Sequence, residues 1–102
     1  MKYIVTVRGV LKDTAEGAAQ KTHDAIVERL TPRGRSLGSS GHRAFLNTQD
    51  KREFLAIDTW ESAEGMQQFM SDQSVGADIA SLFEGQPQVT VWSESGWSGY
   101  GG

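Results

Sequence analysis

The chain has 102 residues and a formal net charge of -3, with 13 acidic and 10 basic side chains spread along its length. This size predicts one domain with one core, and the weak charge excludes the basic face that nucleic acid would need. The sequence holds no cysteine, which excludes disulfides, thiolate catalysis and thiolate metal sites.

Residues 3–10 predict the first strand, because Tyr, Ile, Val and Thr dominate this run and favour extended backbone. Alternation places Tyr3, Val5 and Val7 on one face. Gly9 favours a bulge or a close approach to another element. The apolar run is too short for a signal peptide or a membrane span, so we expect a cytoplasmic protein that does not bind a membrane.

Residues 14–30 predict the first helix, with Thr14 as its N-cap and apolar side chains recurring at helical spacing. We expect Pro32 and Gly34 to end it, because proline interrupts the hydrogen-bond ladder and glycine supplies a turn. His23 falls at the border of the apolar stripe, where we expect it to be exposed to solvent.

Residues 37–48 predict the second strand, and Gly38 and Gly41 predict a bend or a bulge in its first half. Alternation places His42 on one face of this strand and Phe45 on the other.

The central stretch runs from a strand over residues 54–60 into a second helix. The polar connection at residues 49–52 predicts a hairpin, which makes this strand an antiparallel neighbour of the preceding one. Ser62 is the predicted N-cap of the helix, and Glu64 favours its positive end. Trp60 would then lie between sheet and helix, where a small α+β domain has space for a pocket.

A break at Asp72 separates the second helix from a short third one. Residues 85–87 are expected to end this helical region, and residues 88–94 predict the last strand. The glycine-rich residues 96–102 predict a flexible tail outside a domain of residues 1–95. The apolar stripe of the second helix consists of Ala63, Met66, Phe69 and Met70.

This order of elements predicts an α+β fold, the ferredoxin-like βαββαβ arrangement with an antiparallel four-stranded sheet and its helices on one face. The similar segments at residues 14–17 and 62–65, each expected to open a helix, support two related halves. Helices on one face would leave Phe45 and Trp92 exposed on the other, so we expect a homodimer closed sheet on sheet.

Asp58 and His42 are the candidate catalytic residues. Asp58 shares a strand face with Trp60, and a buried carboxylate must face a pocket or be paired, with Arg8 or Arg43 as the expected partners. An interface ion pair and a pocket acid or base are the two alternatives. His42 is a candidate general base, and a position at the sheet edge or the dimer interface is its alternative.

The candidate ligand-pocket residues are apolar. Trp60 is either a core side chain or a pocket wall, and Met66, Phe69 and Met70 are open to the same two interpretations. No spacing typical of a metal site is present, so we expect no metal. The sequence also contains no phosphate-binding loop and no inferable Ser-His-acid arrangement.

The pattern Phe-Leu-Ala-Ile-Asp-Thr-Trp-Glu-Ser at residues 54–62, followed by Phe69 and Asp72, resembles the dimeric α/β-barrel superfamily, specifically its antibiotic biosynthesis monooxygenase-like group. The resemblance covers roughly residues 2–94 as topology. It implies a dimer of ferredoxin-like subunits, each with a pocket between sheet and helices. Some members of this group oxidise polycyclic phenols to quinones with molecular oxygen and neither metal nor flavin, and others cleave haem.

Residue by residue, the resemblance assigns Trp60 to the pocket tryptophan of both the quinone-forming and the haem-cleaving members. The asparagine that quinone-forming members place four residues earlier is Ala56 here, and the aromatic residue that they place six later is Met66. The second helix also lacks the histidine by which haem-cleaving members hold iron.

Two functions therefore remain open. The first is a cofactor-independent monooxygenase-like enzyme acting on a small hydrophobic or aromatic molecule, with Trp60 shaping the pocket and His42 or Asp58 moving a proton. The second is a non-catalytic dimeric module that binds a small molecule or has a structural role. We expect no cofactor in either case.

Overall fold

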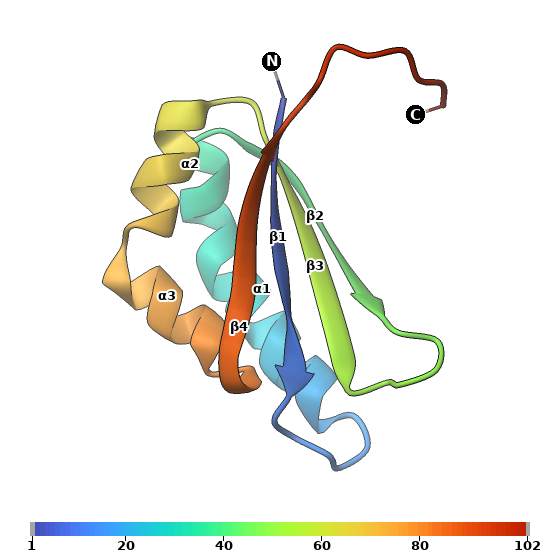
Figure 1. The fold of residues 1–102 in the computed structure, drawn as a ribbon. Coiled ribbons are helices and arrows are strands. Elements are labelled where there is room, and N and C mark those ends of the chain that lie inside the picture. Colours follow the sequence, from blue (N-terminus) through green and yellow to red (C-terminus); the bar gives the residue numbers. More distant parts are fainter. Residues whose placement is uncertain (1, 102) are drawn as a thin grey trace.

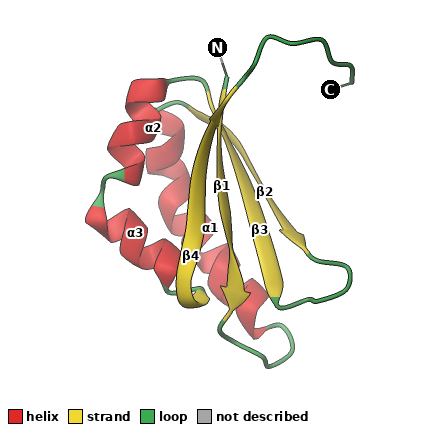
Figure 2. Cartoon of the chain, in the orientation of Figure 1, coloured by secondary structure: helices red, strands yellow, loops and turns green. Residues whose placement is uncertain are grey.

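The computed structural model describes residues 2–101 and confirms the ferredoxin-like topology. One antiparallel sheet has the strand order β2-β3-β1-β4, and three helices gather on one of its sides (Figures 1 and 2). The elements are β1 (Tyr3–Leu11), α1 (Ala18–Ser36), β2 (Ser39–Leu46), β3 (Glu53–Trp60), α2 (Ala63–Met70), α3 (Gln73–Ala80) and β4 (Phe83–Ser93).

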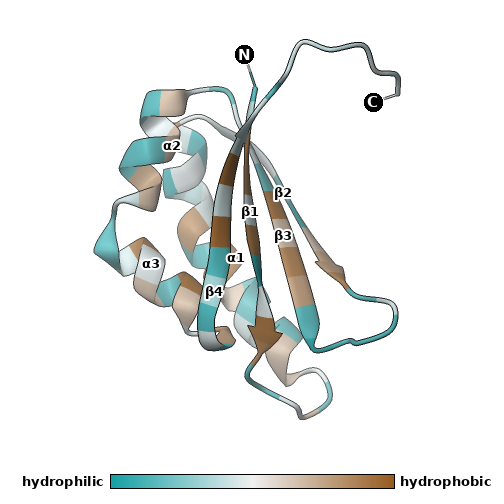
Figure 3. Ribbon diagram, in the orientation of Figure 1, coloured by the Kyte–Doolittle hydropathy of each residue, from teal (hydrophilic) through white to brown (hydrophobic). Residues whose placement is uncertain are grey.

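Alternate residues of the two central strands form the floor of the core. Val5 and Val7 of β1 are buried, as the predicted faces require, whereas the intervening Thr6 is only half-buried. In Figure 3, apolar colour covers much of β3 and the upper part of β4, whereas the lower part of β4 is polar and the helices alternate between polar and apolar segments. The core consists of Val5, Val7, Leu11, Ile26, Phe54, Ala56, Trp60, Met66, Phe69, Val75, Leu82 and Phe83.

Both predicted strand irregularities are confirmed. The pairing of β1 with β4 shifts register between Arg8 and Val10, and a Cβ placed at Gly9 would approach the Phe83 ring to 2.6 Å. The pairing of β2 with β3 shifts register in the first half of β2, at Gly41. The glycine at the first site therefore leaves space for a core aromatic ring.

The N-terminal end of α1 differs from the prediction. The helix begins at Ala18, and its N-cap is Gly17, whose φ of 77° lies in the left-handed region that glycine tolerates. Thr14 precedes the helix and does not cap it, so only the second of the two similar segments opens a helix. There, Ser62 accepts a hydrogen bond from the Gly65 amide at 3.0 Å, which confirms the predicted cap of α2.

The predicted end of the first helix is also wrong, because α1 continues through Pro32 to its last turn. Proline removes one donor from the ladder, but the packing of the last turn favours helix. Gly34 is buried there, and a Cβ placed on it would lie 3.7 Å from the Phe69 ring. Arg33 in the same turn pairs with Asp72 at 2.9 Å, which ties α1 to the junction of α2 and α3.

The last strand begins earlier than predicted. Residues 85–87 lie inside β4, opposite the register shift at Gly9, and do not end the helical region. Gly85 adopts a φ of 73° there. Beyond β4, residues 94–101 have no regular secondary structure. Among residues 2–101, no helix is long and apolar enough to cross a membrane.

The sheet face away from the helices carries exposed aromatic residues. Phe45 lies opposite Leu55 in the sheet, and Trp92 lies opposite Ile4, so both point away from the core. Phe45 is 49% exposed and Trp92 is 55% exposed. The Trp92 indole donates to the Thr6 hydroxyl of β1 at 3.0 Å. The predicted exposure of this face in a single chain is confirmed.

Candidate active site

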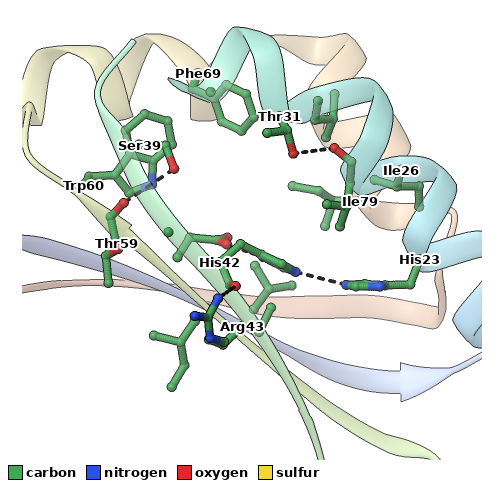
Figure 4. Close-up of a pocket in the computed structure, with 18 of the residues that line it drawn as sticks. His23, Ile26, Thr31, Ser39, His42, Arg43, Thr59, Trp60, Phe69 and Ile79 are labelled. Carbon is green, nitrogen blue, oxygen red and sulfur yellow. Dashed lines mark hydrogen bonds and ion pairs between the residues drawn. The ribbon is translucent and has the colours of Figure 1, made fainter. Parts of the chain in front are cut away.

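A pocket of about 810 Å³ lies between α1 and the β2–β3 side of the sheet (Figure 4). Its walls are mainly apolar, and the aromatic residues Trp60 and Phe69 lie at one end. The two histidines of the chain lie at the other end. An apolar cavity with a few polar groups on one side is the usual form of a site for a small organic molecule.

The sheet register brings His42 and Asp58 together. The two residues lie directly opposite each other on β2 and β3, and opposite residues of an antiparallel pair share a face. That face is the one toward the helices, because Asp58 lies two residues from both Ala56 and Trp60, which are buried against them. Both side chains therefore line the pocket.

The partner of Asp58 is His42, whose Nδ1 donates to Oδ1 of the carboxylate at 2.5 Å. The two side chains are 31% and 25% exposed. The predicted pairing of Asp58 with Arg8 or Arg43 is wrong, because strand alternation points both guanidinium groups away from the carboxylate. Arg8 pairs with Glu53 on the outer face at 2.8 Å, and Arg43 donates to the main-chain carbonyl of His42.

His23 of α1 is part of the same site, and the prediction that it is exposed is wrong. Its side chain is only 18% exposed, and its Nε2 lies 3.0 Å from Nε2 of His42. The two rings lie end to end, with centroids 5.2 Å apart and planes inclined by 26°, and the Phe54 ring lies 5.6 Å from His23. The Nδ1 of His23 donates to Oδ1 of Asp24 at 2.9 Å. A sequence signal existed: His23 precedes Ile26 by three residues, which puts both on one helix face.

Trp60 is almost fully buried, with 2% of its surface exposed, and its ring lies 5.2 Å from that of Phe69. Its Nε1 is buried and has no hydrogen-bond partner among residues 2–101. A buried donor without an acceptor costs free energy, and such atoms often mark the place of a bound group.

The four candidate pocket residues divide into two pairs. Trp60 and Phe69 border the cavity, whereas Met66 and Met70 are absent from its lining. Met66 is buried in the core, and Met70 packs against the core from its edge. Of the three residues on this stripe of α2, Met66, Phe69 and Met70, only Phe69 therefore reaches the pocket.

No group of three or more His, Asp or Glu side chains within residues 2–101 is arranged to hold a metal ion. The two histidines at the polar end of the pocket each form a hydrogen bond with a carboxylate, His42 with Asp58 and His23 with Asp24. Such contacts orient an imidazole and stabilise it once it has gained a proton, which is the arrangement of a general base.

The sequence matches no family model and no curated protein. The fold is similar to that of Rv0793 from Mycobacterium tuberculosis, with a TM-score of 0.70 and 16% identity over 97% of this chain and 100% of that one. It is also similar to SnoaB, a cofactor-independent oxygenase from Streptomyces nogalater, with a TM-score of 0.67 and 9% identity over 92% and 93% of the two chains.

A third solved structure, an antibiotic biosynthesis monooxygenase, gives a TM-score of 0.65 and 11% identity over 93% of this chain and 99% of that one. These likenesses confirm, for the fold, the resemblance to the antibiotic biosynthesis monooxygenase-like group. At such low identity they show the fold alone.

Proposed function

We propose that this chain is a cofactor-independent monooxygenase-like protein that binds a small hydroxylated aromatic molecule in the pocket between α1 and the sheet. The observation that carries the proposal is the hydrogen bond between His42 and Asp58 inside a mainly apolar cavity. The carboxylate holds Nδ1 protonated, so Nε2 is the basic nitrogen of the His42 ring.

In the proposed reaction, a phenolic or enolic O–H bond of the substrate breaks and the proton goes to imidazole. The electron pair of that bond stays on the substrate as a delocalised anion. The anion then reacts with molecular oxygen at the ring carbon that is a methylene group in the keto form of the substrate. One oxygen atom replaces both hydrogens as a carbonyl group, and the other leaves as water. The substrate supplies all the electrons of this reaction.

Trp60 supports a polar aromatic ligand. Its indole and the ring of Phe69 give the pocket a flat apolar wall, on which an aromatic molecule stacks favourably. The buried Trp60 Nε1, which has no hydrogen-bond partner within residues 2–101, is a donor for a carbonyl or hydroxyl oxygen of the ligand.

A homodimer closed sheet on sheet is part of this proposal. Phe45 and Trp92 are exposed on the outer face, and a hollow of about 520 Å³ lies between them. A second copy of the same face would remove these rings from water. The cytoplasmic location expected from the sequence stays a prediction.

The experiment is to measure oxygen consumption by the purified protein with dithranol, a dihydroxyanthrone that carries the required ring methylene group. We expect turnover, and we expect His42→Gln and Asp58→Asn each to lower its rate by about 100-fold, the usual contribution of a general base. Trp60→Phe keeps the aromatic wall and removes the donor, so binding should weaken by about tenfold.

Asp78→Asn is the matched control, because Asp78 pairs with Arg29 at 2.9 Å on the helical layer and does not line the pocket. It should leave turnover unchanged. A protein that binds dithranol without consuming oxygen faster than buffer does would rule out the oxygenase.

The second candidate function is a non-catalytic dimeric module that binds a small molecule. Ala56 and Met66 favour it, because they stand where the resemblance places the polar and aromatic residues of quinone-forming members. For this function, Trp60→Phe weakens binding of the probe, whereas His42→Gln changes no rate because there is none to change.

A further inference from the structure

Four side chains from three elements form one continuous hydrogen-bonded row. Asp24 and His23 come from α1, His42 from β2 and Asp58 from β3. The three contacts along the row measure 2.9, 3.0 and 2.5 Å. Both histidines line the pocket, so the middle of the row is the part that a ligand reaches (Figure 4).

The chemistry of the two ends fixes the protons on the rings. An ionised carboxylate only accepts hydrogen bonds, so Nδ1 of each histidine must carry a proton. A neutral imidazole has only one N–H group. When both rings are neutral, the two Nε2 atoms therefore face each other as bare lone pairs at 3.0 Å.

One additional proton resolves this conflict. Placed between the two Nε2 atoms, it converts a repulsive contact into an N–H···N hydrogen bond, and all three contacts of the row are then satisfied. The row would hold three ring protons on two imidazoles, one positive charge between two carboxylates. The two facing nitrogens thus form a site that one proton completes.

We infer that His23 and His42 act together as one base, with the proton taken from the substrate held between their two Nε2 atoms. This inference rests on the proposed function and adds His23 to the residues that perform it. The substrate O–H bond breaks, an N–H bond forms at the facing nitrogens, and the electron pair remains on the substrate oxygen.

The His23 end of the row provides the route to water. The Asp24 side chain is 62% exposed, whereas the Asp58 side chain at the other end is 25% exposed. When the Nδ1 proton of His23 passes through Asp24 to solvent, the proton taken from the substrate stays on Nε2 of His23 and both rings are neutral. Exchange of the His23 ring proton with water then restores the Nδ1–H form. His42 and Asp58 therefore face the substrate, and His23 and Asp24 release the proton.

Apart from the histidines and Asp58, the charged residues at the pocket within residues 2–101 are two exposed arginines. Arg35 belongs to the last turn of α1, and Arg43 follows His42 on β2. Arg43 donates to the main-chain carbonyl of His42 and not to either ring. The proton balance of the site is therefore set by the two histidines and their two carboxylates.

The first test needs no ligand. Long-range proton–nitrogen NMR spectra of the full chain should show both rings with Nδ1 protonated. Asp24→Asn removes the carboxylate charge at an exposed position of α1, so it should change the proton position in the His23 ring and leave that of the His42 ring unchanged. Two rings that carry their protons on Nε2 in the unmodified chain would overturn the paired base.

The second test uses dithranol and the variant His23→Phe, which keeps a ring against Phe54. The absorbance of the bound probe reports its anionic fraction, and calorimetry in two buffers counts the protons released. The unmodified chain should bind the anion and release no proton. In His23→Phe the ratio of anionic to neutral bound probe should fall about tenfold, because one charge-assisted hydrogen bond is lost.

The outcomes separate the two proposals. If the chain binds anionic dithranol without proton release and without oxygen uptake, the oxygenase is wrong and the paired base stands. If His23→Phe binds the anion and consumes oxygen as well as the unmodified chain does, His42 works alone and the paired base is wrong.

Discussion

The two faces of the sheet are built from the same strands but hold different kinds of interaction. On the face toward the helices, Val5 and Trp60 are almost fully buried, and no polar or charged residue among residues 2–101 is buried with them. On the outer face, Arg8 pairs with Glu53, and Trp92 lies half-exposed over the sheet. Alternation along each strand creates both faces, and only the helices decide which one becomes the core.

The covered face itself differs from one side to the other. The side under α2 and α3 is apolar, with Val75 and Phe83 buried in it. The side under α1 holds the histidines and Asp58, each partly exposed. Polar groups inside an apolar core cost stability unless they are paired, so their position at the border of the core keeps that cost small. The site therefore occupies the edge of the core and not its centre.

The sharpest test of the two faces compares phenylalanines on either side of the sheet. Phe54 is 5% exposed and touches the Phe83 ring, whereas Phe45 on the outer face is 49% exposed. We expect Phe54→Ala to lower the free energy of unfolding by about 4 kcal/mol, because it leaves a cavity in the core. Phe45→Ala should cost about 0.5 kcal/mol at concentrations where the chain is monomeric. Urea unfolding measures both, and equal losses would contradict the distinction.

The next test measures how tightly the helices cover the inner face. A Cβ at Gly65 of α2 would lie 1.6 Å from the main-chain oxygen of Leu37, which neither group can avoid without moving backbone. Gly65→Ala should therefore cost about 3 kcal/mol.

Gly76 of α3 is its matched control, because nothing lies within 4 Å of a Cβ placed there. Gly76→Ala should stabilise the chain by about 0.5 kcal/mol through a less flexible unfolded state. Thermal unfolding of the two variants compares them directly. If both variants change the unfolding temperature in the same direction, the expected contrast between close packing at Gly65 and open space at Gly76 is wrong.

A third test asks whether the outer face is an interface. Val91 and Trp92 are neighbours on β4 with 53% and 55% exposure, but they point to opposite faces. Trp92→Ala should weaken the proposed dimer by about 2 kcal/mol, or about thirtyfold in Kd, as truncation of an interface tryptophan commonly does. Val91→Ala should leave it unchanged. Sedimentation reports the result, and an unmodified chain that sediments at 11.1 kDa at micromolar concentration would remove the dimer.

The smallest expected effect concerns charge in the helical layer. Hydrogen bonds from Ser74, and the nearby Arg33 guanidinium, hold the pKa of Asp72 below its ordinary value of 3.8. Because the pKa is lower in the folded chain, ionised Asp72 adds stability above pH 3.8, and this contribution is lost as the pH falls through the folded value.

Asp72→Asn keeps an acceptor for the cap of α3 and removes the charge. It should be slightly less stable than the unmodified chain at neutral pH and equal to it in strong acid. Denaturant midpoints across this pH range measure the difference. A difference that grows on acidification would show that the pKa shift has the opposite sign.

Much of the fold could be predicted because it depends on local patterns. The strand ending at Trp60, the Ser62 cap and the two strand irregularities follow from residue types within a few positions of one another. The errors occur where distant contacts compete with local preference. Pro32 did not end α1 because Gly34 and Arg33 gain contacts with α2 and the start of α3.

The candidate site was predictable only in part. Alternation placed Asp58 and Trp60 on one face of a strand, and the structure puts both along one pocket. The partner of Asp58 could not be read from alternation within one strand, because it depends on which residue of β2 lies opposite. His23 was missed because its environment is formed by a strand that follows it by nineteen positions, at His42.

The sequence by itself determined which side chains share a face within each helix and strand, because that follows from the geometry of a single element. Only the tertiary structure decided which faces meet. The register of β2 on β3 set His42 opposite Asp58, and the placement of α1 beside β2 brought His23 to the other side of the His42 ring. These arrangements depend on packing between segments far apart in the chain, about which local patterns carry no information.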